Sequence, residues 1–261
     1  MGLPASQYPD ARCRPQPGGT DDRGAAPQGL RPYWSHAQRY LLAALLLTGT
    51  AQADSYRIAT YSAPLSRDGP GLLLRDIQRG ADPQIAAIAD IVGHIGPDVL
   101  VLTDFDDDRD NKELRSFAEL FGPACPRIFA LRPNAGLATG LDLDADGRLG
   151  DARDAQGYGR FAGDGGLAIL SRLPPSADQV NDLSDMLWKD LPGATLPQVN
   201  GVSFLTTDAQ NILRLSSTGH WVVPIMPPDE PPFSLMVYEA TPPVLDGPED
   251  LNGQRTRDEL R

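Results

Sequence analysis

The first regular pattern along the chain predicts a strand, a helix and a second strand. Residues 56–61 alternate between apolar and polar positions, which suits a strand with one buried face. An amphipathic helix then begins at Asp82, which can cap it, and Pro83 fits its first turn. After a Gly-Pro pair, residues 98–103 are almost continuously apolar, as expected for a strand buried on both faces.

The remainder of the pattern predicts mainly strands. Residues 133–163 have no apolar periodicity and much Gly and Asp, so we expect a long surface loop there. The resulting fold class is α/β, a two-sheet β-sandwich flanked by helices. The other expected elements are a helix over 112–121 and strands over 127–131, 166–171, 212–215, 221–225 and 234–237.

A short apolar run precedes the predicted domain. Residues 41–47 read Leu-Leu-Ala-Ala-Leu-Leu-Leu, Arg39 lies before them, and an Ala-Gln-Ala site follows at residues 51–53. These features are typical of a secretory signal peptide over residues 33–53, cleaved after Ala53; the alternative is a buried helix of the domain. The run is too short for a membrane span. We therefore expect a secreted or periplasmic protein without a membrane anchor after processing.

Residues 1–32 are rich in Pro, Gly, Arg and Asp and lack periodicity. They are interpreted as a disordered leader or as the product of a wrongly assigned start codon. Of the two cysteines, Cys13 lies in this leader, so Cys125 would be alone in residues 54–261 and unable to form an intrachain disulfide. We expect Cys125 to be a buried, inert thiol.

The composition and charge of the chain indicate which binding partners are favoured, and they are compatible with the predicted fold. The chain has 261 residues, 41% of them hydrophobic and 22% charged, which suits one globular domain. Its formal net charge is −12, and the acidic excess lies after the leader. Such a surface repels a polyanion, so binding of nucleic acid is disfavoured, whereas a small phosphoester remains compatible with it.

Four stretches of the chain carry a family resemblance: residues 57–62, 97–104, 165–172 and 235–243. In their order and spacing they resemble the endonuclease/exonuclease/phosphatase superfamily, which has the deoxyribonuclease-like fold. The similarity covers nearly all of residues 56–261. It implies a metal-dependent phosphoesterase that uses Mg²⁺ or Mn²⁺ on a phosphoester of unknown type.

The resemblance also implies site residues, and several depart from the family pattern. Ser62 stands where the family has a metal-associated Asn, and Asp104 where it has a metal-associated Glu. Asp104 is therefore a candidate ligand, with a solvated acidic loop as the alternative. Glu239 occupies the position of a family His and is a candidate catalytic residue. His220 is a second catalytic candidate; alternatively it is a structural His packed beside Trp221.

The family's later Gly-Asp-x-Asn and Ser-Asp-His segments would lie downstream of Arg261. The resemblance therefore implies a domain that is incomplete at the C-terminus, within a helix that precedes those segments. Missing strands would leave apolar surface and an unpaired edge exposed. Impaired catalysis by this chain alone is the expected consequence.

A second candidate metal site lies in the long loop. Residues 142–151 contain a D-x-D-x-D-G pattern, which supplies the alternate carboxylates and the turn glycine of a calcium loop. The twelfth position is Arg153 rather than Glu, so Asp151 or Asp154 would have to replace the missing ligand. The alternative is a solvated acidic loop. The candidate ligands are Asp142, Asp144 and Asp146.

Three functional hypotheses follow. The first is an exported member of a metal-dependent phosphoesterase family with impaired activity. The second is a non-enzymatic, calcium-binding extracellular module or pseudoenzyme. The third is the product of a broken gene, without function.

Overall fold

The computed structural model describes residues 55–122 and 127–261. Residues 57–261 belong to one unit. The predicted leader and signal peptide, and Cys125, lie outside the described residues. Among the helices that the structure describes, none combines the length and apolar composition needed to cross a membrane.

The first sheet contains the strands expected near residues 56–61, 98–103, 127–131 and 166–171, which are confirmed. Its first two strands are parallel, and the other pairs are antiparallel. The order across the sheet is β1 (Ile58–Leu65), β2 (Val99–Phe105), β4 (Gly166–Ser171) and β3 (Arg127–Phe129).

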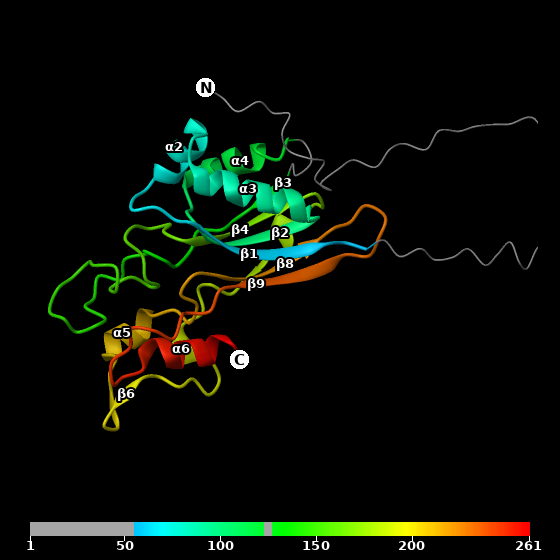
Figure 1. Cartoon of the computed structure of the whole chain (residues 1–261). Coiled ribbons are helices and arrows are strands. Elements are labelled where there is room, and N and C mark those ends of the chain that lie inside the picture. The colour runs from blue at the N-terminus through cyan, green and yellow to red at the C-terminus, as the bar shows by residue number, and fades with distance from the viewer. Residues whose placement is uncertain (1–54, 123–126) are drawn as a thin grey trace, which may run out of the picture. The chain divides into compact units, whose positions relative to one another are not determined.

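Three helices cover one face of this sheet (Figure 1). They are α2 (Leu72–Arg79), α3 (Pro83–Ile95) and α4 (Lys112–Glu119). Asp82 caps α3 as predicted, because its Oδ1 accepts hydrogen bonds of 2.8 and 3.1 Å from the N–H groups of Gln84 and Ile85. Helix α2 was not predicted, although Leu73 and Ile77 are buried four residues apart on one helical face.

A second sheet packs against the other face of the first one. Its order is β5 (Asn181–Asp182), β8 (His220–Ile225) and β9 (Phe233–Tyr238), which confirms the strands expected at 221–225 and 234–237. Trp221 of β8 is fully buried and meets Phe129 of β3 edge-on, with ring centroids 5.6 Å apart. The two-sheet sandwich flanked by helices is therefore confirmed.

The outer strands of the two sheets carry exposed apolar side chains. β1 is at one end of the first sheet and β9 at one end of the second. Ile58 on β1 is 47% exposed and Met236 on β9 is 70% exposed. Each sheet therefore has an outer strand with an exposed apolar side chain.

The strand predicted at residues 212–215 is wrong. Helix α5 (Thr207–Ile212) ends there, and the following segment makes only an isolated bridge between Leu187 and Arg214. The apolar alternation arises instead because Leu213 and Leu215 pack around Trp188 in a separate core cluster. The remaining short elements are β6 (Gln198–Val199), β7 (Val202–Ser203), and the 3₁₀ turns Arg109–Asn111, Ala177–Gln179 and Trp188–Asp190.

Helix α6 (Leu251–Glu259) is held by buried charged side chains rather than by an apolar face. Oδ2 of Asp258 accepts hydrogen bonds from Nε1 of Trp188 at 2.7 Å and from N–H of Thr195 at 2.6 Å. Glu259 accepts hydrogen bonds from the N–H groups of Ser217 and Thr241, at 3.0 and 2.5 Å. The helix thus connects the segments that follow β5 and β9 with the one that precedes β8.

Residues 133–163 form no helix or strand of their own, as predicted, but they are anchored to the core. Asn134 is fully buried, and its Nδ2 donates to the carbonyls of Ser184 and Ser216 at 2.9 and 2.7 Å. Its Oδ1 accepts a hydrogen bond of 2.6 Å from Arg214. A buried amide with all its groups paired fixes this end of the loop.

Glu113 of α4 is a buried carboxyl group that titrates near neutral pH. Its side chain is 1% exposed, and its Oε2 has no hydrogen-bond partner among the described residues. Burial, with a smaller contribution from the charge of Asp108, raises its pKa from 4.5 to about 7. The folded protein therefore binds more protons than the unfolded chain between these values, and stability falls as pH rises through them.

Replacing Glu113 by Gln should remove part of this loss, because an amide keeps the shape without the charge. We expect the variant to exceed the wild type in stability by on the order of 1–3 kcal/mol at about pH 8, and by little at about pH 4. Thermal unfolding across this range measures the difference, with the exposed Glu119→Gln in the same helix as control. Parallel pH curves for Glu113→Gln and wild type would contradict the assignment.

Candidate active site

The carboxyl ends of β1 and β2 are irregular at the same level. In the parallel pair Ser62 lies opposite Thr103, and the register then shifts so that Leu65 lies opposite Phe105. The pairing of β2 with β4 shifts at the same point. Asp104 lies within this bulge with a left-handed φ of 58°. Bulges redirect side chains and are common beside functional sites, so the backbone sets where the Asp104 carboxylate lies.

The Asp104 carboxylate is half-buried against a glycine turn. A Cβ on Gly165 would lie 3.1 Å from its Oδ1, and Gly165 has a φ of +65°. Burial raises the pKa of Asp104, and the negative charge of Asp164 adds to this; the hydroxyl of Ser66 and the charge of Arg67 act in the opposite direction. The hydroxyl of Ser66 and the charge of Arg67 therefore compensate the negative charge of Asp104 only in part.

Asp106, two residues further on, has a structural role. Its Oδ2 accepts a hydrogen bond of 2.8 Å from N–H of Arg67, and its Oδ1 accepts one of 3.1 Å from N–H of Gly165. Burial raises its pKa to about 7. Asp106 thus ties the end of β1 to the glycine turn on which the Asp104 carboxylate rests.

Glu239 comes from the second sheet to the same place. Val237 is buried and Tyr238 exposed, so the next side chain returns to the face that meets the first sheet. The hydroxyl of Thr103 hydrogen-bonds its carboxylate. Burial raises the pKa of Glu239, and the charges of Asp104 and Glu259 raise it further.

Three of the predicted site residues therefore meet around Thr103. Ser62 is its strand partner, Asp104 follows it in the sequence, and Glu239 accepts its hydroxyl hydrogen bond. Ser62 is exposed, so its hydroxyl is open to solvent. The site combines oxygen donors from both sheets and, in these residues, no cationic group.

His220 lies on the other side of the second sheet. It pairs with Tyr238, and the two rings stack with centroids 4.9 Å apart and planes 13° apart. Burial lowers the pKa of His220, with the charge of Glu259 acting in the opposite direction. Trp221 points to the opposite face, toward Phe129. The structure does not bring His220 together with Asp104 and Glu239.

The second candidate site is a group of three carboxylates in the long loop. Among the described residues, Asp142, Asp144 and Asp146 are the only such group whose candidate ligand atoms all lie within 4.8 Å of one another. Asp142 accepts hydrogen bonds from N–H of Asp146 at 3.1 Å and of Gly147 at 2.8 Å, which folds the loop around its carboxylate.

The residues considered as replacements for the missing twelfth ligand have other partners. Asp154 is buried, and its two oxygens accept hydrogen bonds from N–H of Leu143 and Gly150 at 2.9 and 2.7 Å. Asp151 accepts one of 2.8 Å from N–H of Arg153. The guanidinium of Arg153 itself lies 3.5 Å from the carboxylate of Asp144. A cation in this loop would therefore compete with Arg153.

The fold and the paired carboxylates define an α/β sandwich with an acidic site where the two sheets meet. The model of the endonuclease/exonuclease/phosphatase family matches residues 76–250, about two thirds of the chain. The chain belongs to this family. The resemblance drawn from the four sequence stretches is thereby confirmed.

Comparison with solved structures finds similarity to an endonuclease/exonuclease/phosphatase from Beutenbergia cavernae DSM 12333. The identity is 14% and the TM-score 0.44, over 78% of this chain and 41% of that protein. The present chain thus spans less than half of the length of that protein. Comparison with curated proteins finds no match.

The sequence did not identify several residues that shape the site. Asp106 and Asp164 could have been suspected from their position beside the ends of strands. No local sequence pattern marks Glu259, because its partners Ser217 and Thr241 are far from it in the sequence. Thr103 could have been identified, because it is a polar residue at the end of an apolar strand, next to the candidate ligand Asp104.

Replacing Gly165 by Ala tests the contact with Asp104. The new Cβ would press on the carboxylate, in addition to the cost of a left-handed backbone, which is on the order of 1 kcal/mol. Gly80→Ala is the matched control, because Gly80 has a φ of +61° and open space around it. We expect thermal unfolding to show a larger loss for Gly165→Ala, and the excess to shrink when Asp104 is also replaced by Ser. Equal losses at the two glycines would refute the contact.

Proposed function

We propose that this chain carries the metal site of a divalent-cation-dependent phosphoesterase, formed by Asp104 and Glu239 with the hydroxyl of Ser62 beside them. The observation that supports this most is the meeting of two half-buried carboxylates from different sheets, each with a raised pKa. Carboxylate and hydroxyl oxygens are the donors that Mg²⁺ or Mn²⁺ accepts. Two carboxylates and one hydroxyl are fewer ligands than the ion takes, which suits an ion that keeps several waters.

Such an ion supplies charge neutralisation of the phosphate and stabilisation of the leaving oxygen. The chain's own contribution is to hold Asp104 in the bulge and to orient Glu239 through the hydroxyl of Thr103. His220, on the far face of the second sheet, is not placed to activate the attacking water at this site. We therefore propose that the chain binds the cation but hydrolyses phosphoesters slowly.

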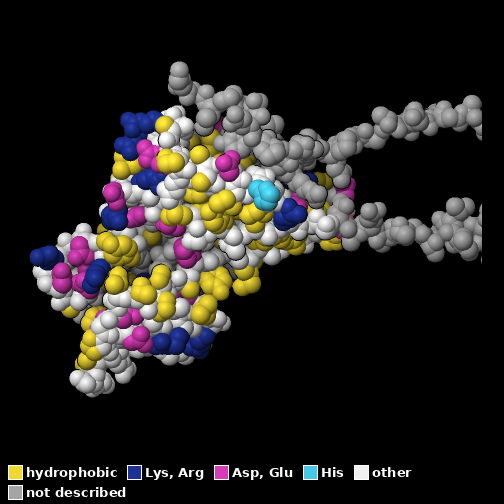
Figure 2. Space-filling view, in the orientation of Figure 1, with side chains coloured by type: hydrophobic (Ala, Val, Ile, Leu, Met, Phe, Trp, Pro, Cys, Tyr) yellow, Lys and Arg dark blue, Asp and Glu magenta, His cyan; other side chains and the backbone are white. Residues whose placement is uncertain are grey.

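The proposed substrate is a small phosphoester rather than a nucleic acid duplex. The net charge of −12 opposes accumulation of a polyanion. On the face shown in Figure 2, Lys and Arg lie in separate small groups among acidic and apolar side chains, not in a continuous basic stripe. We also propose that the protein is exported, on the basis of the signal-peptide pattern at residues 33–53.

Removing the charge of Asp104 tests the proposed site. We expect Mn²⁺ or Mg²⁺ to raise the thermal unfolding temperature of the wild type, and Asp104→Asn to lose this shift, because one of the two carboxylates is gone. Hydrolysis of bis-p-nitrophenyl phosphate, measured in parallel, should be slow in the wild type and fall about tenfold or more in the variant.

Asp110→Asn is the matched control, because it removes the same charge from an exposed neighbouring position whose left-handed φ of 72° Asn tolerates. It should keep both the thermal shift and the residual hydrolysis. The proposal fails if Asp104→Asn keeps them as well. Rapid turnover at a normal enzymatic rate would contradict only the proposed impairment of hydrolysis, and not the proposed metal site.

A second candidate function is a calcium-stabilised module without catalysis. It is supported by the carboxylate group of Asp142, Asp144 and Asp146, whose candidate ligand atoms lie within 4.8 Å of one another. Calcium accepts six to eight oxygen ligands, and extracellular calcium is abundant enough to fill weak sites. The ion pair between Arg153 and Asp144 limits the affinity that this loop can reach.

Arg153→Glu should strengthen calcium binding, because it removes the competing guanidinium and supplies a carboxylate at the twelfth position of the loop. Calorimetric titration should show an affinity at least about tenfold higher than in the wild type. Asp142→Asn should weaken binding, and the response should persist in Asp104→Asn. The calcium hypothesis is rejected if neither the wild type nor Arg153→Glu responds to millimolar calcium.

A further inference from the structure

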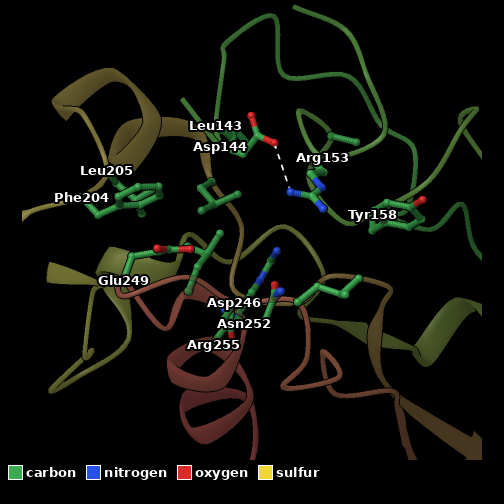
Figure 3. A pocket seen from close by; sticks show the side chains of 14 residues that line it. Leu143, Asp144, Arg153, Tyr158, Phe204, Leu205, Asp246, Glu249, Asn252 and Arg255 are labelled. Atoms are coloured by element: carbon green, nitrogen blue, oxygen red, sulfur yellow. Dashed lines mark hydrogen bonds and ion pairs between the residues drawn. The ribbon is translucent and has the colours of Figure 1, made fainter. Parts of the chain in front are cut away.

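A cavity separates the acidic loop from the start of α6 (Figure 3). The space between its walls is about 750 Å³, including the part that is open to solvent. Its walls come from the long loop, from the segments on both sides of α5, and from the approach to α6. Half of the fourteen wall side chains are aliphatic or phenyl groups: Leu143, Ala155, Phe204, Leu205, Leu213, Leu245 and Leu251.

The cavity also contains a buried cation. Arg255 of α6 is 6% exposed, and Figure 3 shows its side chain extending from the helix toward the cavity. Its Nε donates to the carbonyl of Leu215 at 2.9 Å, and its Nη2 donates to the carbonyls of Gln156 and Arg214 at 2.6 and 2.7 Å. Among the described residues, no acceptor is recorded for Nη1.

Arg255 has no carboxylate in direct contact within the described residues. Its nearest charged influence is Glu259, one turn further along the helix, whose oxygens are already bonded to Ser217 and Thr241. Burial lowers the pKa of Arg255 to about 10, and the charge of Glu259 only partly offsets this. A buried guanidinium without a counterion favours an anion that can reach it.

The acidic residues of the cavity wall are engaged elsewhere. Asp246 accepts hydrogen bonds from N–H of Asn252 and Gly253 at 2.8 and 2.9 Å and so holds the first turn of α6. Glu249 accepts one of 2.9 Å from N–H of Gly247. Asp144 is paired with Arg153. The charged group of the wall that has only neutral carbonyl partners among the described residues is therefore the guanidinium of Arg255.

The cavity also includes two large apolar side chains that are exposed to solvent. Leu245 is 81% exposed and has a left-handed φ of 62°, a conformation that is unfavourable for Leu. Tyr158 is 65% exposed. Such exposed apolar surface beside a concave site is typical of ligand binding.

We propose that this cavity binds a small amphiphile with an apolar body and one carboxylate. The carboxylate pairs with the guanidinium of Arg255, and the body lies against the apolar wall and the side chain of Leu245. An arginine with a free donor suits a carboxylate because charge-assisted hydrogen bonds are short and strong. The site shares no residue with the proposed phosphoesterase site, so each can fail without the other.

Decanoate is a suitable probe, with decanol and decylammonium as neutral and cationic analogues of the same length. Calorimetric titration of the full chain in buffer with EDTA keeps metal ions out of the neighbouring acidic loop. We expect decanoate to bind about tenfold more tightly than decanol, and decylammonium to bind most weakly. Arg255→Met should abolish the preference for decanoate over decanol.

Because Arg255→Met removes three hydrogen bonds and can unfold the protein, a second pair of variants is needed. Leu245→Asp and Leu245→Asn both suit the left-handed backbone and differ only in charge. We expect decanoate to bind about threefold more weakly to Leu245→Asp than to Leu245→Asn, while decanol binds the two equally. Equal binding of decanoate and decanol to the wild type, equal decanoate binding to the two Leu245 variants, or no binding at millimolar probe would each overturn the proposal.

Discussion

The hydrogen bonds that Glu259 accepts from Ser217 and Thr241 fix the geometry on which the candidate site depends. Ser217 lies just before β8, and Thr241 lies two residues after Glu239. One buried carboxylate therefore holds the start of one strand and the end of its neighbour. This constraint keeps Glu239 on the inner face of the sandwich, where the hydroxyl of Thr103 reaches it.

The acidic site is formed against the usual preference of carboxylates for water. Asp104, Asp106 and Glu239 all have raised pKa values, mainly because they are buried. Asp106 is compensated by two backbone N–H groups, and it holds the turn on which Asp104 rests. The charge of Asp104 instead raises the pKa of Glu239 further, in addition to burial. Unpaired, like charges held together by the fold are the condition under which a cation binds most favourably.

The two acidic sites differ in how they are assembled. The loop at Asp142 is local, because its carboxylates accept hydrogen bonds from N–H groups a few residues away. The site at Asp104 joins residues more than a hundred positions apart in two sheets. The cavity above Arg255 is again assembled from distant segments. Its chemistry is the reverse of the other two, since its buried charge is a cation that is hydrogen-bonded to carbonyls but has no counterion in the part of the chain that the structure describes.

The sequence by itself determined what depends on near neighbours. The Asp82 cap of α3, the buried strand before Asp104 and the carboxylate pattern of residues 142–146 each follow from spacing along the chain. The tertiary structure decided which distant residues meet: Glu239 with Asp104, His220 on the opposite face, and residues 213–215 in a core cluster rather than a sheet. The reason is physical. Strand register and long-range hydrogen bonds choose among partners that look equivalent in the sequence, and that choice depends on packing the two sheets together.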